Sequence, residues 1–312
     1  MQRWHDVTEV PGDLGPSVVT IGVFDGVHRG HQRVIGEVLA RARAWAGGAK
    51  SVVVTLDPNP ISVVRPDATP RKVASLERRL ELFEELGVDG VLVLPFTKER
   101  SQQPAEEFVR ELVGLLRPVA IVVGDDFRFG FKAAGDVALL TRLGPELGFE
   151  VEGITRGAGD PTWSSTAVRE RLAAGDVAGA QEVLGHQFRI DGTVVRGEQR
   201  GRELGFPTAN VPADAALALP VDGVYAGWLT RRDGDPTPLP AAISVGTKPQ
   251  FGEHELVIEA YVLDRTDLEL YDVPVSIEFT ERIRGQEVFG SIEELIETMN
   301  RDVDKARDLL TS

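Results

Sequence analysis

Two histidines separated by two residues, His28 and His31, are the first side chains whose spacing suggests chemistry. They lie among glycines in GVFDGVHRGH (22–31), directly after an apolar run and before a stretch with helical spacing. A helix N-terminus offers free N–H groups and the positive end of the helix dipole, which suit phosphate. Histidines at positions i and i+3 share a face there and can both donate hydrogen bonds to phosphate oxygens. The alternative is a surface pair of histidines, with the glycines serving only the turn.

A second candidate for phosphate binding is SSTAVR (164–169). Ser164, Ser165 and Thr166 precede a helical stretch and can donate hydroxyl and backbone hydrogen bonds. Arg169, one turn further on, would bring a fixed positive charge. The same three residues can instead be an ordinary helix N-cap. A metal site at the histidines is less favoured, because no third ligand lies nearby at metal-site spacing.

The C-terminal part of the chain carries a different set of polar residues. Thr208 and Asn210, in PTAN, offer neutral oxygens to a hard cation such as Mg²⁺. Glu259 is the one carboxylate within the apolar run VIEAYVL. The glycine-rich run 192–205 could present N–H groups to phosphate, although it lacks the Gly-Lys-Ser/Thr of a Walker loop. As alternatives, PTAN is a plain turn and Glu259 points outward without a function.

Strands and helices alternate before residue 186 and would position the histidine motif. Continuous Val/Ile runs predict strands, and amphipathic spacing predicts helices. The predicted strands are 17–24, 51–56, 88–96 and 119–124, and the predicted helices are 31–45, 75–87 and 104–116. Unbroken apolar runs are typical of strands buried on both faces, so we predict an α/β domain with a doubly wound parallel sheet. Ligands of such sheets bind beyond the carboxyl ends of the strands.

The pattern changes after a helical stretch at 166–184. Short strands separated by Gly- and Pro-rich turns predict an antiparallel β-barrel or sandwich. An amphipathic helix at 291–310 follows these strands. The predicted domains are therefore 1–186 and 187–312.

Composition narrows the class of protein further. The length of 312 residues is typical of about two domains. A net charge of −15 argues against unspecific attraction to nucleic acid or anionic membranes. The chain has no cysteine, which excludes disulfides, thiolate metal sites and a cysteine nucleophile. No apolar run approaches the roughly 20 residues that cross a bilayer. We expect a cytoplasmic protein with no nucleic-acid or membrane partner. The sequence allows an oligomer but does not predict one.

Several motifs in a fixed order resemble one known family. GVFDGVHRGH resembles the His-x-Gly-His motif of nucleotidylyltransferases, in the variant typical of bifunctional bacterial riboflavin kinase/FAD synthetases. Similar motifs follow in the family's order: DPNP (57–60), GDDFRFG (124–130), SSTAVR (164–169), GTVVRGEQRGRELGFPTAN (192–210), SVGTKPQFG (244–252) and VIEAYVLD (257–264). The resemblance spans residues 18 to about 310. Two departures are Asn59, where the family usually has histidine, and Asp272, where it usually has glycine.

The resemblance implies two ATP-dependent reactions, with flavin as substrate and product. A Rossmann-like N-terminal domain would adenylylate FMN to FAD with release of pyrophosphate. A C-terminal riboflavin kinase barrel with a terminal helix would phosphorylate riboflavin with Mg-ATP. The implied catalytic residues are His28, His31, Arg169 and, as general base, Glu259. Implied contacts to ATP and phosphate are Gly22, Phe24, Asp25, Ser164, Ser165, Thr166, Gly197, Arg202 and Gly205; those to flavin are Asp57, Asp126, Phe127, Phe129 and Arg284; those to Mg²⁺ are Thr208 and Asn210.

Other interpretations stay open from the sequence alone. The phenylalanines of GDDFRFG could be buried under a loop, and Arg284, Phe289 and Glu294 could be surface or helix-packing residues. Only one module could be active, the other serving to bind a ligand or partner. An RNA-binding barrel is disfavoured, because residues 250–312 are acid-rich and lack basic runs interleaved with aromatics. The three polar residues of the barrel together favour the bifunctional enzyme, since a pure binding barrel would not need them.

Overall fold

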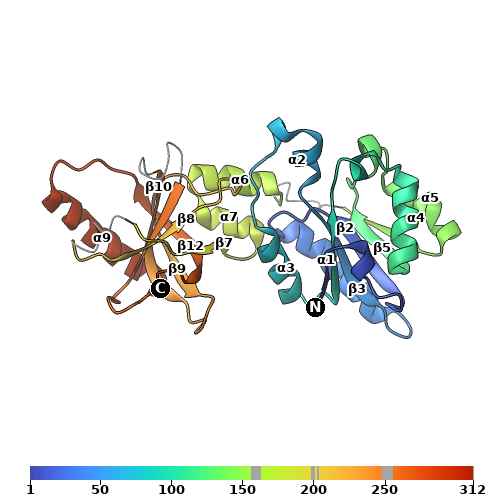
Figure 1. Cartoon of the computed structure of the whole chain (residues 1–312), viewed down its shortest axis with the longest axis horizontal. Coiled ribbons are helices and arrows are strands. Elements are labelled where there is room, and N and C mark those ends of the chain that lie inside the picture. The colour runs from blue at the N-terminus through green and yellow to red at the C-terminus, as the bar shows by residue number, and fades with distance from the viewer. Residues whose placement is uncertain (156–162, 198–200, 202–203, 248–255, 312) are drawn as a thin grey trace. The chain divides into compact units, whose positions relative to one another are not determined.

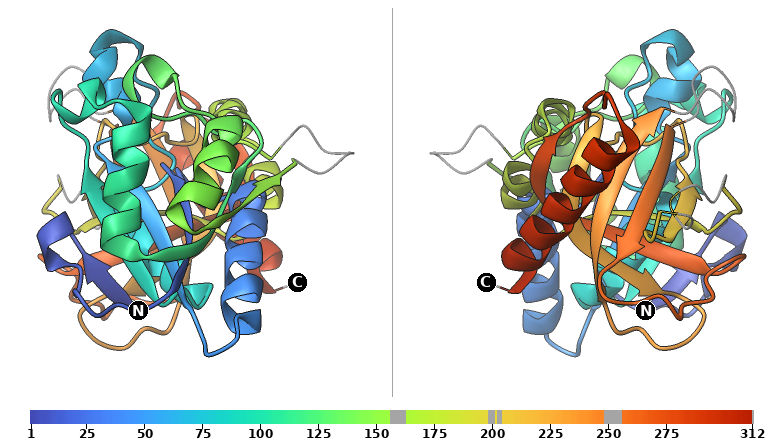
Figure 2. Two further views of the ribbon diagram at one scale, coloured as in Figure 1. Left: turned by 90° about the vertical axis from the view of Figure 1, so that its right-hand side faces the viewer. Right: turned by 90° about the vertical axis from the view of Figure 1, so that its left-hand side faces the viewer.

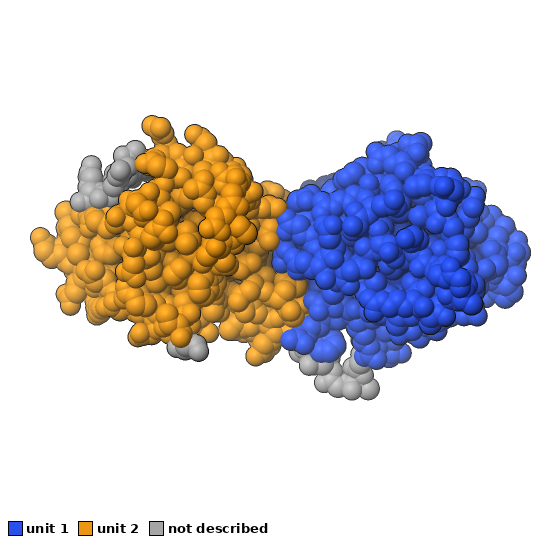
Figure 3. Space-filling view, turned by 90° about the horizontal axis from the view of Figure 1, so that it is seen from below, with its two compact units in different colours: residues 1–70, 75–164 blue, residues 71–74, 165–312 orange. Residues whose placement is uncertain are grey.

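The chain forms two compact units. They are seen in a computed structural model that describes residues 1–155, 163–197, 201, 204–247 and 256–311 (Figure 1). Unit 1 comprises Met1–Pro70 and Ser75–Ser164, and unit 2 comprises Arg71–Ala74 and Ser165–Ser312 (Figure 3). Each unit is built on a sheet of its own. The two kinds of sheet agree with the two patterns in the sequence.

Unit 1 contains a six-stranded sheet in the order β1-β4-β3-β2-β5-β6, and its described pairings are all parallel. The strands are β1 (Gln2–Trp4), β2 (Ser17–Gly22), β3 (Lys50–Asp57), β4 (Gly90–Pro95), β5 (Pro118–Gly124) and β6 (Glu150–Ile154). The central strands are almost wholly buried, which is why they appear in the sequence as unbroken apolar runs. The predicted doubly wound parallel sheet is confirmed.

Helices cover both faces of this sheet (Figures 1 and 2). The helices of unit 1 are α1 (Arg29–Ala44), α2 (Pro60–Val64), α3 (Leu76–Glu85), α4 (Ala105–Leu116) and α5 (Val137–Leu147), with short 3₁₀ turns η1 (Val7–Glu9), η2 (Pro66–Ala68), η3 (Arg100–Gln102) and η4 (Phe131–Ala133). Val53 of β3 packs with residues of α1 and α3, whereas Val52 and Val54 pack with residues of α4 and α5. The helices that follow neighbouring strands β2 and β5 therefore lie on opposite faces. That arrangement opens a crevice at the carboxyl ends of these two strands.

Unit 2 contains a curled antiparallel sheet in the order β7-β12-β9-β10-β11-β8. Its strands are β7 (Phe188–Thr193), β8 (Thr208–Pro212), β9 (Gly223–Arg231), β10 (Leu239–Thr247), β11 (Leu256–Val262) and β12 (Pro274–Gly285). A bridge between Val195 and Asn210 joins the chain just beyond β7 to β8, so the sheet curls back on itself. Tyr225, Ile243 and Phe279 are fully buried. The predicted antiparallel barrel is confirmed.

Helices α6 (Ser165–Ala174), α7 (Val177–Leu184) and α9 (Ile292–Thr311) belong to the described part of unit 2. Helix α9 packs along the sheet against β9, β10 and β12 (Figure 2). The stretch predicted as helical at 166–184 is two helices, α6 and α7, because Asp176 caps a new helix by accepting from the Gly179 N–H at 2.8 Å. By their contacts both helices group with the barrel, while the domain boundary near residue 186 stays a prediction.

A short insertion also belongs to unit 2. Lys72 forms a parallel bridge with Leu217, and its N–H donates to the Ala216 carbonyl at 2.7 Å. Residues Arg71–Ala74 thus join the barrel unit although the chain on both sides of them belongs to unit 1. Within the described ranges, no helix is both long and apolar enough to cross a membrane.

Candidate active sites

The crevice at the carboxyl ends of β2 and β5 contains both predicted histidines. It is a cavity of about 170 Å³, lined by the ends of β2, β5 and β6 and by the N-terminus of α1. His28, 7% exposed, directly precedes α1, and His31 lies in its first turn. Their rings stack with centroids 3.6 Å apart and planes inclined by 22°. The helix N-terminus and two imidazoles thus face one cavity.

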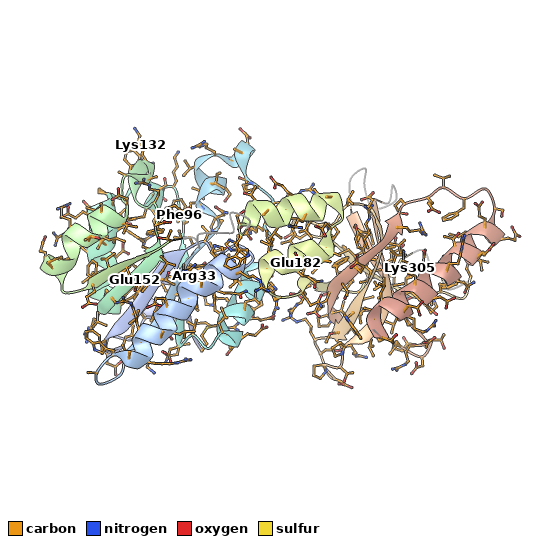
Figure 4. All side chains as sticks on the ribbon, turned by 180° about the vertical axis from the view of Figure 1, so that it is seen from behind. Arg33, Phe96, Lys132, Glu152, Glu182 and Lys305 are labelled. Atoms are coloured by element: carbon orange, nitrogen blue, oxygen red, sulfur yellow. The ribbon has the colours of Figure 1, made fainter. Side chains whose placement is uncertain are left out.

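Other predicted residues share this cavity. The structure places Gly22, Phe24, Asp126 and Phe127 in its lining. The side chain of Arg33 on α1, which sequence reasoning did not single out, also lines it (Figure 4). The two histidines can donate hydrogen bonds and Arg33 carries a positive charge. An anionic ligand could therefore occupy this cavity.

The loop between β2 and α1 has an unusual backbone. Phe24, Gly26 and Val27 have φ angles of 53°, 79° and 41°, in the left-handed region that costs energy for residues other than glycine. The Phe24 ring meets His31 edge-on at 5.2 Å and Phe83 of α3 at 5.7 Å between centroids. Asp25 is 7% exposed within the same loop. We call residues 23–28 the histidine loop.

Asp57, at the end of β3, lies against a buried arginine that sequence reasoning missed. Arg79 Nη2 donates to Asp57 Oδ1 at 2.7 Å, and Arg79 is 3% exposed. Burial is the largest influence on the Arg79 guanidinium and lowers its pKa, while the carboxylates of Asp57 and Asp25 act to raise that pKa. In the sequence this arginine stands in ERRLE, where helical charge pairs are usually solvated.

The aromatic residues after β5 separate into two environments. Asp126 is exposed and Phe127 is half-buried, and both lie at the cavity. Phe129 is 8% exposed and packs in the hydrophobic core, 5.9 Å from Phe108. Its predicted flavin contact stays a prediction. Asn59, the departure from the family pattern, caps α2 by accepting from the Ile61 N–H at 3.2 Å.

The SSTAVR residues surround the start of α6. Ser164 is the last residue of unit 1, whereas Ser165, Thr166 and Arg169 belong to unit 2. Arg169 Nε donates to the carbonyl of Arg71 at 2.7 Å, within unit 2. The phosphate contacts of Ser164, Ser165, Thr166 and Arg169 stay predictions.

A second cavity, of about 490 Å³, lies in unit 2. Its lining includes Gly197, Gly205, Thr208, Asn210 and Glu259, so five of the predicted residues come together. Arg202 lies outside the described residues. This cavity is called the barrel cleft below.

Strand register explains why Glu259 faces the barrel cleft. Glu259 of β11 lies directly opposite Asn210 of β8, and the fully buried Ile258 points to the other face. Because side chains alternate along a strand, Glu259 and Asn210 share the face opposite to Ile258, the face that lines the barrel cleft. The carboxylate and the amide are thus cross-strand neighbours.

The barrel cleft contains a buried carbonyl oxygen suited to a cation. Asn210 is 6% exposed, and its Nδ2 donates to the Thr208 carbonyl at 3.2 Å. Its Oδ1 is buried and has no hydrogen-bond partner among the described residues. A Cβ on Gly197 would lie 2.6 Å from that oxygen, so the glycine keeps the space beside it open. A hard cation would satisfy this acceptor, so the residues present fit Mg²⁺.

Arg284 and its neighbours hold the C-terminal helix. Arg284 Nη2 lies 2.7 Å from Asp302 Oδ2 on α9, and its guanidinium lies 5.7 Å from the Phe289 ring centroid. Glu294 accepts from the Gly290 N–H at 2.9 Å at the start of α9. Arg284 is absent from the described lining of the barrel cleft. Arg284, Phe289 and Glu294 therefore have the helix-packing contacts that the sequence offered as one interpretation. The flavin contact of Arg284 stays a prediction.

Breaking this ion pair should loosen unit 2. The side chains of Arg284 and Asp302 are only 17% and 10% exposed. Asp302→Asn removes the negative charge and leaves the Arg284 guanidinium buried without a counter-ion at this position. We therefore expect a loss of about 3 kcal/mol in the free energy of unfolding. Urea denaturation followed by tryptophan fluorescence measures the change. The double variant Arg284→Met/Asp302→Leu should regain most of it. An unchanged unfolding midpoint in Asp302→Asn would show that the pair contributes nothing.

Comparisons with known proteins agree with these two sites. A family model described as FAD synthetase matches residues 11–166, and one described as riboflavin kinase matches residues 184–310. A bifunctional riboflavin kinase/FMN adenylyltransferase of Escherichia coli (strain K12) is 36% identical over 306 residues, covering 97% of this chain and 95% of that protein. A protein of the same description from Pseudomonas fluorescens is 38% identical over 295 residues, covering 94% and 92%. A crystal structure described as a macrolide-efflux protein from Streptococcus pneumoniae is similar over 98% of both chains, with a TM-score of 0.86 and 26% identity.

Proposed function

Because this chain belongs to the bifunctional riboflavin kinase/FMN adenylyltransferase family, we infer that it converts riboflavin to FMN and FMN to FAD. The observation that carries this inference is the presence of two separate cavities. The one in unit 1 has two histidines at a helix N-terminus, and the one in unit 2 has Glu259 beside Asn210. Each cavity lies in the part of the chain matched by the corresponding family model.

We propose that the cavity of unit 1 carries out adenylyl transfer. A phosphate oxygen of FMN attacks the α-phosphorus of ATP, the bond to the β-phosphate oxygen breaks, and pyrophosphate leaves. The reaction needs no protein nucleophile, because positioning and charge stabilisation supply most of the rate. His28 and His31 donate to the triphosphate, together with N–H groups at the start of α1.

The remaining assignments in the adenylylation reaction follow from position and family. Gly22, Phe24 and Asp25 surround the nucleotide, while Asp57, Asp126, Phe127 and Phe129 are assigned to the flavin side. Ser164, Ser165, Thr166 and Arg169 are assigned to phosphate through hydroxyl groups, N–H groups and a guanidinium. These assignments rest on the family motifs.

We propose that the barrel cleft carries out the kinase reaction. The Glu259 carboxylate accepts the proton of the riboflavin 5′-hydroxyl as that oxygen attacks the γ-phosphorus of ATP, and ADP leaves. Thr208 and Asn210 would hold Mg²⁺, which neutralises charge on the phosphates when bound. Backbone N–H groups near Gly197 and Gly205 contact phosphate oxygens, and Arg202 is assigned to phosphate by family resemblance. Arg284 is assigned to the flavin side on the same ground.

The direct test is a time course with purified protein, riboflavin, ATP and Mg²⁺. Flavins separated by chromatography should show FMN first and FAD afterwards. Unchanged riboflavin would refute the kinase assignment. Supplying FMN in place of riboflavin tests adenylylation separately, and unchanged FMN would refute that assignment.

Gly197→Ala should impair the kinase reaction selectively. The added methyl group would lie 2.6 Å from Asn210 Oδ1 and displace the proposed cation ligand. A shift of this size in a positioned group costs up to about 100-fold in rate, so we expect a loss of at least about tenfold in FMN formation. The control is Gly234→Ala, where nothing lies within 4 Å of the added atom. Equal kinase rates in both variants would argue against a cation at Asn210.

Two coarser features are proposals as well. We place the functional boundary between the modules near residue 186, supported by the riboflavin kinase match that begins at residue 184. We propose a cytoplasmic location, because both reactions consume ATP.

A further inference from the structure

We propose that Arg79, one of two buried arginines of α3, is a positioning residue for FMN adenylylation. It would hold the histidine loop and Asp57 in the arrangement that receives the triphosphate. The inference rests on the proposed function of unit 1 and assigns a role to a residue outside the cavity lining.

Arg79 joins the ends of two neighbouring strands. Its Nη1 donates to the Val23 carbonyl at 2.6 Å and to Thr55 Oγ1 at 3.0 Å. Its Nη2 donates to Asp57 Oδ1 at 2.7 Å. Thr55 Oγ1 in turn donates to the Val23 carbonyl at 3.1 Å. One guanidinium therefore fixes the first residue of the histidine loop to the last residue of β3.

Helix α3 supports the histidine loop at a second point. Phe83 lies one turn after Arg79, and its ring contacts the ring of Phe24. The Phe24 ring in turn contacts the ring of His31. A continuous path of contacts thus runs from α3 to the histidine rings. Because Phe24 and Val27 hold left-handed backbone angles, the loop needs such support to keep its shape.

The chemistry of arginine explains why an apolar residue would not serve. Burying a charge is costly, and the carboxylates of Asp57 and Asp25 offset that cost. The planar guanidinium donates in two directions at once, whereas a lysine ammonium on its flexible stem cannot reproduce both contacts. The arrangement gives a directional hold on the Val23 carbonyl, the group from which the loop departs.

The experiment compares Arg79→Lys and Arg79→Met with matched changes at Arg78. Arg78 has a side chain only 8% exposed, and its described ion pairs are with Glu81 and Glu85 of the same helix. For each full-length variant, kcat and KM for FMN adenylylation are measured beside the riboflavin kinase rate and the thermal unfolding temperature. The kinase rate serves as an internal measure of folded unit 2.

We expect kcat for adenylylation to fall about 100-fold in Arg79→Met and about tenfold in Arg79→Lys. Kinase rates should stay at the wild-type value, and both Arg78 variants should stay within about twofold of it in both reactions. An Arg79→Lys protein with wild-type kcat would overturn the proposal. So would a loss in Arg79→Met that matches only its unfolded fraction.

A second readout separates this proposal from the proposed function. The chain has five histidines, so the ring signals of His28 and His31 can be followed by NMR without substrate. These signals should shift in Arg79→Lys and stay unchanged in Arg78→Lys. Unshifted signals would overturn the positioning role, even in an active enzyme. Wild-type protein that fails to adenylylate FMN would instead refute the proposed function and leave the NMR comparison valid.

Discussion

Glu259→Gln is expected to lower FMN formation from riboflavin about a thousandfold and to leave FAD formation from supplied FMN unchanged. Glutamine keeps the size of the side chain but cannot accept the proton of the attacking hydroxyl. Glu259 lies in the barrel cleft opposite Asn210, whereas the histidines line a cavity of the other unit. Chromatographic assays with riboflavin and with FMN, run on the same preparation, measure the two rates.

Glu278→Gln is the matched control for this change. Glu278 is half-buried on β12 of the same barrel and is absent from the described lining of the barrel cleft. It should therefore keep both activities. If folded Glu259→Gln protein lost both activities equally, the assignment of one reaction to each unit would be wrong. If the Glu259→Gln protein kept its full kinase rate, Glu259 would not be the general base.

His28→Ala should produce the opposite division. We expect FAD formation to slow by about 100-fold to 1000-fold, the usual loss when one preorganised donor to a charged transition state is removed. The His28 ring stacks on His31, so its removal also frees the second imidazole. The kinase rate should be unaffected, because Glu259 and Asn210 lie in unit 2. Initial rates at saturating ATP, with FMN or riboflavin as substrate, give the comparison.

His5→Ala controls for the loss of an imidazole from unit 1. His5 is exposed and lies outside the described cavity lining. Its replacement should change neither rate. Kinase activity lost from His28→Ala while adenylylation persists would reverse the placement of the two sites.

Four strands of unit 1, β2 to β5, could be predicted from sequence, because burial on both faces produces an unbroken run of apolar residues. Each Val/Ile run matched a strand to within about two residues, as with 51–56 and β3 (Lys50–Asp57). Glu259 and Asn210 could be singled out as residues, and the register that places them opposite each other came from pairing between distant strands. Asp272 has a φ of 62°, which explains why the family can use glycine there and why aspartate is tolerated.

Other features of the structure could not be predicted from the local sequence pattern. Strand β1 has three residues, and its place beside β4 depends on Trp4, whose ring occupies the space above Gly90. The partner of Arg284 is Asp302, 18 residues further along the chain on another element. Arg79 and Arg78 are adjacent and chemically identical, yet only tertiary packing directs Arg79 under the histidine loop. Such roles are decided by contacts between elements, which periodicity does not report.

The insertion Arg71–Ala74 bears on any attempt to divide this enzyme into two separately encoded halves. The Lys72 N–H donates to Ala216, its carbonyl accepts from the Ala218 N–H at 2.7 Å, and the Arg71 carbonyl accepts from Arg169. A gene cut after codon 164 would assign these four residues to the wrong product. The barrel half would then expose the Ala216 carbonyl and the Ala218 N–H, which the insertion normally pairs. Unpaired backbone groups of this kind promote aggregation. Point substitution is therefore the safer way to isolate either activity, and a designer who needs a free-standing kinase must supply a substitute for that missing segment.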